Sequence, residues 1–281
     1  TEISPHLRLR DRYQLYAGVR PVKAYPNAPM PLADPRASKI DLVIIRESTE
    51  GLFFSAAVHG RSNIIDNAVC DETLRITRAT SEKLHDFAFR LATKRKDKGH
   101  KGQVTCVDKA NVFASMAFFR QIFDEVSANY PNINKAYNYV DAAALDLIRR
   151  PWTADVMVME NMFGDILSDL AGGLVGGMGM AACGEIGDQI GLFQPAHGSA
   201  PDIMGQDKAN PLGAILSAKL MLDYLAEKLG QPAYEDAAMI LDAAIETGFA
   251  LNRFRPIEFG GNMGTKAVTL ALSSLMDGKL K

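Results

Sequence analysis

Four short apolar runs in the chain each end in charged or amide side chains, which is typical of buried strands in a mostly parallel sheet. The runs cover residues 40–45, 103–107, 136–140 and 155–159. The polar side chains that follow them are Arg46-Glu47, Asp108-Lys109, Asp141 and Glu160-Asn161. Because the carboxyl ends of parallel strands meet at one edge of a sheet, we expect these groups to share that edge.

Amphipathic segments separate the apolar runs. Residues 71–96 and 113–126 carry apolar side chains at i, i+3, i+4 and i+7, the spacing of one helix face. The last third predicts helices over 211–229, ending at Gly230, and over 234–247. Residues 24–35 hold four prolines and predict a loop. The alternation of strands and helices predicts an α/β fold.

Composition narrows the class of protein. The 281 residues are 47% hydrophobic and 23% charged, enough to bury the cores of about two domains. Because 31 basic residues nearly balance 33 acidic ones, neither nucleic acid nor a membrane surface is an expected partner. Three scattered cysteines without a CxxC pair favour a reducing, cytoplasmic compartment. The chain begins at Thr1 and not at a methionine, so an organellar location stays open.

Two carboxylates one helical turn apart form the strongest local signal. Asp165 and Asp169 lie in a predicted helix, where the i,i+4 spacing puts them on one face and their charges repel. A cation would remove that repulsion, and all-oxygen ligands favour Mg²⁺ or Mn²⁺ over zinc. Asp141, at a strand end, is a third candidate ligand. The alternative is that Asp165 caps the helix and Asp169 is solvated.

Basic side chains at the borders of apolar segments suggest an anion site. Arg10, Arg20 and Arg46 hold such positions, and a guanidinium fork suits bidentate binding of the carboxylates of a di- or tricarboxylic acid. Lys109 follows a buried strand, where burial and neighbouring cations would favour general-base work. Ordinary surface arginines and a lysine with a buried stem are the alternatives.

The loop-forming segment 194–211 could wrap a nucleotide. It carries His197, Asp202 and Asn210 among glycine, proline and serine residues. An aspartate beside a ribose would accept from its 2′-hydroxyl and repel a 2′-phosphate, which favours NAD over NADP. Asx turns are the alternative for Asp202 and Asn210. A formal GxGxxA from Gly177 follows a helix and not a strand, so we do not interpret it as a Rossmann fingerprint.

Together these segments resemble the β-decarboxylating dehydrogenases, the family of 3-isopropylmalate, isocitrate, homoisocitrate, tartrate and D-malate dehydrogenases. The resemblance covers almost the whole chain, and the motifs occur in the order that the family has. They are Leu9-Arg10, Val19-Arg20-Pro21, Arg46-Glu47-Ser48-Thr49-Glu50-Gly51, Val107-Asp108-Lys109-Ala110-Asn111, Tyr139-Val140-Asp141, Gly164-Asp165-Ile166-Leu167-Ser168-Asp169, His197-Gly198-Ser199-Ala200-Pro201-Asp202 and Ala209-Asn210-Pro211.

The resemblance implies a set of roles. Arg10, Arg20 and Arg46 would bind the substrate carboxylates. Asp165 and Asp169 would be metal ligands from one subunit of a homodimer, whereas Asp141, the third ligand, and Lys109, the base, would reach the same site from the other. NAD would contact His197, Gly198, Ser199, Ala200, Asp202 and Asn210.

The implied reaction is an NAD-dependent oxidative decarboxylation of a 2-hydroxy di- or tricarboxylic acid with Mg²⁺ or Mn²⁺. We favour a 3-substituted malate such as 3-isopropylmalate, with tartrate, D-malate, isocitrate and homoisocitrate as alternatives. The segment 4–9, expected to be a loop beside the substrate, offers Leu7 but also the polar His6 and Arg8.

One position departs from the family pattern in a way that affects chemistry. Phe53 stands where relatives usually have a tyrosine, so the ring is kept and the proton donor is lost. Gln194 and Glu160 are lesser departures. Phe53 motivates a second hypothesis, a non-catalytic regulatory subunit that binds NAD or carboxylates. Lys109 and the three aspartates speak against it.

The resemblance also implies two domains interleaved in sequence, with a mixed sheet and flanking helices. Residues 16–175 would form the inserted substrate, metal and dimerisation domain, and residues 1–15 plus 176–281 the cofactor-side domain. Residues 56–70 would form an arm that pairs with the partner subunit. Because the family's early Gly-Asp-Gly-Ile-Gly-Pro segment is absent, we expect the native polypeptide to be longer.

Overall fold

The structure, a computed structural model, describes residues 5–55 and 63–278. Its contacts divide the chain into two units that alternate in sequence. Unit 1 holds the chain up to Arg20, Leu42–Ser168 and Glu185–Leu192, and unit 2 holds Pro21–Asp41, Asp169–Gly184 and the chain from Phe193 onward. The segment before Arg20 thus clusters with the middle of the chain. The predicted domain boundaries at residues 15 and 175 stay a prediction.

A seven-stranded sheet has the order β6-β5-β7-β2-β1-β8-β9. The apolar runs form four of its strands, β2 (Asp41–Glu47), β5 (Gln103–Asp108), β6 (Asn134–Tyr139) and β7 (Val156–Met159). These four are neighbours and parallel, with β5 paired to both β6 and β7, and β7 paired to β2. Their carboxyl ends therefore meet at one edge, as the sequence predicted. The remaining strands are β1 (Ala17–Lys23), β8 (Ala182–Ile186) and β9 (Gly191–Pro195).

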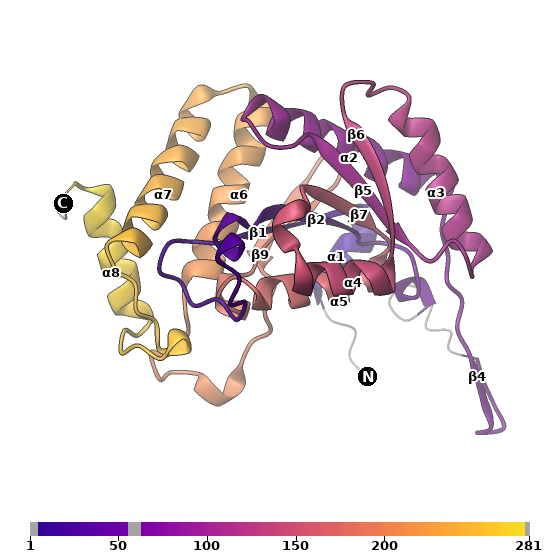
Figure 1. Cartoon of the computed structure of the whole chain (residues 1–281). Helices are drawn as coiled ribbons and strands as arrows, with labels where there is room; N and C mark the ends of the chain where they lie inside the picture. The colour runs from indigo at the N-terminus through magenta and orange to yellow at the C-terminus, as the bar shows by residue number, and fades with distance from the viewer. Residues whose placement is uncertain (1–4, 56–62, 279–281) are drawn as a thin grey trace. The chain divides into compact units, whose positions relative to one another are not determined.

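Helices cover the strands of unit 1 (Figure 1). They are α2 (Arg78–Asp97), α3 (Ala114–Ser127) and α4 (Val140–Arg149). Helix α2 packs against α3, β5 and β7, while α4 packs against β5 and β6. Helix α2 begins seven residues later than predicted because Thr77 caps it, accepting a hydrogen bond from the backbone N–H of Thr80. Of the residues before the cap, Asp71 ends β4 and residues 72–77 belong to no helix or strand.

A two-stranded hairpin extends from unit 1 (Figure 1). It pairs β3 (Asn63–Ile65) with β4 (Val69–Asp71) in antiparallel register, with Ile64 opposite Cys70. Asp66 and Asn67 in its turn have positive φ, which short polar side chains tolerate. The hairpin is the described part of the predicted arm, since residues 56–62 lie outside the described residues. Pairing of the arm with a partner stays a prediction.

Three helices carry the core of unit 2. They are α6 (Leu212–Leu229), α7 (Pro232–Ala250) and α8 (Thr265–Met276), packed in succession. Ile245, Phe249 and Leu272 are buried between them. Gly230 ends α6 with a positive φ, as predicted. Within the described ranges, no helix is both long and apolar enough to span a bilayer.

Two further helices carry residues of the candidate site. They are α1 (Pro5–Arg12) and α5 (Asn161–Gly173). The described part of the segment before Arg10 is thus helical, so the loop expected there was wrong. Short 3-10 turns complete the chain at Pro35–Lys39, Pro151–Thr153, Met178–Met180, Pro201–Ile203 and Ile257–Phe259.

A histidine lies in the core of unit 1. His85, on α2, is fully buried, and its ring centroid lies 4.4 Å from that of Phe119 and 5.3 Å from that of Phe123. Its Nε2 lies 3.2 Å from the backbone oxygen of Phe119. Burial lowers the pKa of His85 to about 3. The imidazole is therefore neutral in the folded protein at neutral pH.

We expect His85 to make the protein less stable in acid. The unfolded chain binds this proton near pH 6.5 and the folded chain only near pH 3, so stability falls as the pH drops through this window. Between pH 7 and pH 5 the loss should be about 2 kcal/mol. Urea unfolding at both pH values should show wild type losing that much more than His85→Gln. Equal losses in the two proteins would contradict neutral burial.

Candidate active site

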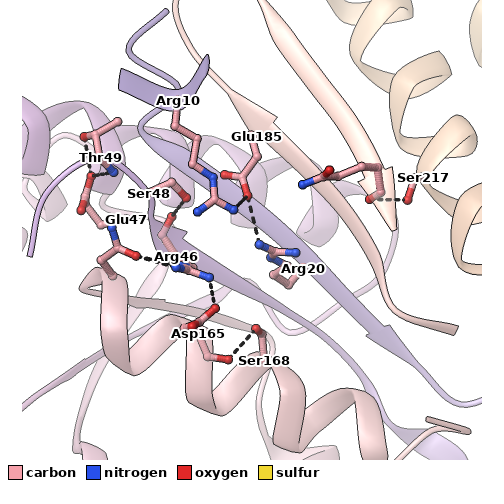
Figure 2. Close-up of polar contacts among 12 residues, drawn as sticks. Arg10, Arg20, Arg46, Glu47, Ser48, Thr49, Asp165, Ser168, Glu185 and Ser217 are labelled. Atoms are coloured by element: carbon pink, nitrogen blue, oxygen red, sulfur yellow. Dashed lines mark hydrogen bonds and ion pairs between the residues drawn. The ribbon is translucent and has the colours of Figure 1, made fainter. Parts of the chain in front are cut away.

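Three arginines and one glutamate form a buried cluster in unit 1 (Figure 2). Arg10 comes from α1, Arg20 from β1, Arg46 from β2 and Glu185 from β8. The Oε1 atom of Glu185 accepts from Nη2 of Arg10 at 2.6 Å and from Nη2 of Arg20 at 3.0 Å. Arg10 and Arg20, both predicted from the sequence to bind carboxylates of the substrate, thus contact the same carboxylate of the protein.

The charged groups of the cluster shift one another's pKa values. Burial alone would raise the pKa of Glu185, but the charges of Arg10 and Arg20 outweigh it and lower that pKa. Glu185 is therefore ionised at neutral pH. Burial lowers the pKa of Arg46, and the neighbouring charge of Arg10 lowers it further. Among the described residues, the buried Nε of Arg10 has no hydrogen-bond acceptor, which leaves one donor of the cluster unpaired.

Sequence reasoning missed Glu185. The residue lies between Gly184 and Ile186 in a run of small and apolar side chains that ends the glycine-rich segment. A carboxylate in such a run is expected to lie in a buried strand, where it needs a cation as its partner. That signal was present in the sequence, although it does not say which arginines provide the partner.

Arg46 connects the cluster to the start of α5. Its Nε and Nη2 donate to Oδ1 of Asn161 at 2.9 and 2.7 Å, and its Nη1 donates to Asp165. The guanidinium lies 5.1 Å from the centre of the Phe53 ring, a cation–π distance. Phe53 therefore lies beside one of the predicted substrate-binding residues.

Glu160 fixes the beginning of α5. It is buried, and its Oε1 accepts a hydrogen bond from the backbone N–H of Phe163 at 2.8 Å. Burial raises the pKa of Glu160. The residue thus caps the helix that carries the paired aspartates.

The paired aspartates lie on α5 as predicted, four residues apart. Since the helix begins at Asn161, Asp165 lies in its second turn, and the capping alternative is wrong. Both side chains reach solvent, and their carboxylate oxygens suit Mg²⁺ or Mn²⁺. Within the described part of the chain, no three His, Cys, Asp or Glu side chains are placed to hold a metal ion. Binding of a metal ion by Asp165 and Asp169 stays a prediction.

Lys109 and Asp141 meet at the shared edge of the parallel strands. Lys109 follows β5, Asp141 lies in the first turn of α4, and Nζ of Lys109 is 2.5 Å from Oδ1 of Asp141. This hydrogen bond lowers the pKa of Asp141. Asp108 is fully buried and accepts from Nε and Nη2 of Arg120, each at 2.7 Å, and from the N–H of Ala110 at 2.8 Å. Those bonds hold the turn that carries Lys109.

The predicted nucleotide loop borders a pocket in unit 2. The pocket has a volume of about 210 Å³, and its lining includes His197, Gly198, Ser199 and Ala200. This is below the roughly 300–1,000 Å³ of pockets that enclose a whole ligand. Asp202 is exposed in the 3-10 turn beside it.

Asn210 lies outside the lining of that pocket. Its Nδ2 donates to Glu258 at 3.0 Å, and its Oδ1 accepts from the N–H of Leu212 at 3.2 Å. The second bond is the Asx-type contact that was the alternative interpretation. Contact of Asn210 or Asp202 with a nucleotide stays a prediction.

Comparison with known proteins finds a matching family model and similar chains. Residues 2–271 match the model of the isocitrate/isopropylmalate dehydrogenase family. The chain is 44% identical over 260 residues to the 3-isopropylmalate/3-methylmalate dehydrogenase of Methanocaldococcus jannaschii, covering 92% of this chain and 73% of that protein. It is 42% identical over 226 residues to the 3-isopropylmalate dehydrogenase of Carboxydothermus hydrogenoformans, covering 79% and 59%.

A solved structure agrees with these relatives. The isocitrate dehydrogenase of Methylococcus capsulatus matches with a TM-score of 0.86 and 31% identity, covering 98% of this chain and 77% of that chain. The fold prediction, an α/β fold with a mixed sheet and flanking helices, is confirmed by this match. The chain spans less than two thirds of the length of the Carboxydothermus protein.

Two glycines of α5 allow a test of how tightly Arg46 is packed. A Cβ on Gly164 would lie 2.6 Å from both Cβ and Cγ of Arg46, whereas a Cβ on Gly173 would meet nothing within 4 Å. We expect Gly164→Ala to lower the free energy of unfolding by about 1–3 kcal/mol. Gly173→Ala should stay within about 0.5 kcal/mol of wild type.

Urea denaturation of the two variants measures this difference on one helix, with Gly173→Ala as the matched control. Similar midpoints for both variants would show that α5 and Arg46 are not in close contact.

Proposed function

The chain belongs to the isocitrate/isopropylmalate dehydrogenase family, and on that premise we propose that it catalyses the NAD-dependent oxidative decarboxylation of a 2-hydroxy acid with two or more carboxylates. The observation that carries the proposal is the buried cluster of Arg10, Arg20 and Arg46 around Glu185. Buried guanidinium groups with an unfilled donor form an anion site suited to carboxylates. A 3-alkylmalate such as 3-isopropylmalate is the favoured substrate, and isocitrate, homoisocitrate, tartrate and D-malate are alternatives.

The arginines would bind and orient the substrate. Arg10, Arg20 and Arg46 are held by other side chains before any ligand arrives, so little order has to be created on binding. Carboxylates fixed there would leave the C2 hydroxyl free to react. Because the guanidinium groups are almost excluded from water, their attraction for an anion is stronger than at the surface.

Lys109 and Asp141 would move the hydroxyl proton. Their direct hydrogen bond supports a path in which Lys109 removes the hydroxyl proton through water and Asp141. NAD would accept the hydride from C2. His197, Gly198, Ser199 and Ala200 would hold part of the dinucleotide, and the carboxylate of Asp202 would select against a 2′-phosphate.

Asp165 and Asp169, with Asp141 from a second copy, would hold Mg²⁺ or Mn²⁺. Such an ion supplies Lewis-acid stabilisation of negative charge on the C2 oxygen. Phe53, beside Arg46, can shape the site but has no hydroxyl to donate a proton to the enol carbon. We infer that water or another side chain supplies that proton.

A homodimer is the proposed assembly. Several large apolar side chains of unit 1 are exposed, including Ile166 on α5, which is 60% exposed, and Leu145 and Ile148 on α4. The β3–β4 hairpin adds exposed Ile64 and Ile65. Exposed apolar side chains on several elements of one unit support burial against a second copy. In that dimer Lys109 and Asp141 would act on the substrate bound by the other copy.

Turnover tests the proposed function. NADH formation with Mn²⁺ should occur with at least one of 3-isopropylmalate, D-malate, tartrate, isocitrate and homoisocitrate, and CO₂ should be released in equal amount. EDTA should abolish the reaction, and Mn²⁺ should restore it. NADP should support slower turnover than NAD. Tight binding of NAD without turnover of any of these acids would favour the regulatory-subunit hypothesis instead.

Hybrid dimers test the sharing of the site. We expect Lys109→Met and Asp165→Asn each to be inactive as homodimers, because each removes one component from both sites. Co-expression with different tags should restore about a quarter of the wild-type activity, since half of the dimers would be hybrids with one intact site.

Co-expression of two differently tagged Lys109→Met chains is the control, and it should stay inactive. If the hybrid preparation is also inactive while its dimers form normally, Lys109 and Asp165 act within the same copy.

A further inference from the structure

Glu185 has no role in the reaction described above, although it pairs with both Arg10 and Arg20 (Figure 2). Its side chain is 0% exposed and receives hydrogen bonds from Arg10 and Arg20 through the same oxygen. Burying a carboxylate is costly unless cations surround it. The position therefore combines a permanent negative charge with groups that are expected to bind an anionic substrate.

Glu185 cannot readily move out of the cluster. A Cβ built on Gly18 of β1 would lie 2.6 Å from Oγ of Ser48 and 3.0 Å from Oε2 of Glu185. The carboxylate is thus packed closely against the backbone of one strand and held by arginines from two elements. A ligand carboxylate has to bind beside Glu185 and not in its place.

The charge balance limits what the cluster can bind. Three guanidinium groups carry three positive charges; the ionised Glu185 cancels one of them, and Asp165 forms an ion pair with Arg46. The remaining positive charge attracts a dianionic ligand, but each further ligand carboxylate is placed in a field weakened by Glu185. A chain with an uncharged residue at this position would attract a trianion more strongly.

Helix α1 carries two further arginines, Arg8 and Arg12, and both are exposed, whereas Glu185 is buried. His6 and Leu7 precede Arg10 and are half-buried, whereas Arg8 is exposed. Burial lowers the pKa of His6, and the charge of Arg10 lowers it further, so the imidazole is neutral at pH 7. The segment before Arg10 is expected to contact the substituent at C3 of the substrate. Its half-buried residues, His6 and Leu7, are therefore uncharged.

We propose that Glu185 determines the substrate class by restricting the arginine cluster to 2-hydroxydicarboxylates with an uncharged group at C3. Acids with a third carboxylate, such as isocitrate, are excluded by charge. The proposal rests on the proposed function, because it assumes that the cluster binds the carboxylates of the substrate. It makes Glu185 a specificity residue and gives it no part in the chemical step.

The test compares Glu185→Gln with wild type, using NAD, Mn²⁺ and three acids, 3-isopropylmalate, D-malate and isocitrate. Wild type should have the higher kcat/KM for one of the two dicarboxylates. In Glu185→Gln the ratio of kcat/KM for isocitrate to that for the better dicarboxylate should rise by about tenfold or more, because the extra positive charge favours the trianion. An unchanged ratio, or a wild type that prefers isocitrate, would overturn the proposal.

Asp155→Asn is the matched control. Asp155 is also a buried carboxylate of unit 1, and its Oδ1 accepts from Nε of Arg95 at 2.7 Å, outside the cluster. This variant should lose stability without changing the substrate ratio. If Glu185→Gln does not fold, Glu185→Asp keeps the charge and should retain the wild-type preference, and loss of that preference in Glu185→Asp would overturn the proposal.

The proposed function and the role of Glu185 are contradicted by different results. No turnover of any acid by wild type would contradict the proposed function. Turnover with a preference for the tricarboxylate would leave that function intact and overturn only the role of Glu185.

Discussion

The hydrogen-bonded contact of Arg10 and Arg20 with Glu185 is the interaction on which the site depends. It joins α1 and β1 to β8, which lies more than 150 residues later in the sequence, and it holds two guanidinium groups away from water. Removing water from such charges costs several kcal/mol each, and apolar residues of the same volume would stabilise the fold as well or better. Stability therefore gives no reason for the cluster, whereas anion binding does.

The rest of the unit 1 site follows from parallel strands. Strands β2, β5, β6 and β7 end at one edge, so Arg46, Lys109 and Asp141 lie at that edge without any long loop to position them. Helix α5 begins there with a buried glutamate cap and carries Asp165 toward Arg46. Each of these charged side chains has a hydrogen-bond partner before a substrate arrives, which is the condition for a preorganised site. They are Arg46, Lys109, Asp141 and Asp165.

Much of this could be predicted from the sequence. The apolar runs predicted the four parallel strands, and the helical spacing predicted the helices and the end of α6 at Gly230. These features follow from burial and backbone conformation, which act locally. The start of α2 was misplaced because the cap at Thr77 competes with an apolar pattern that continues past it. Helix α1, which contains Arg10, was missed because its eight residues are mostly polar and give no clear face. Glu185 was missed because its partners are more than 160 residues away in sequence.

The structure of the complex with Mg²⁺ and a 2-hydroxydicarboxylate tests the central claim most directly. The account predicts that a substrate carboxylate accepts hydrogen bonds from the guanidinium groups of the cluster while Arg10 and Arg20 keep their contacts with Glu185. A substrate bound away from the three arginines, or a carboxylate that displaces Glu185 from them, would contradict it.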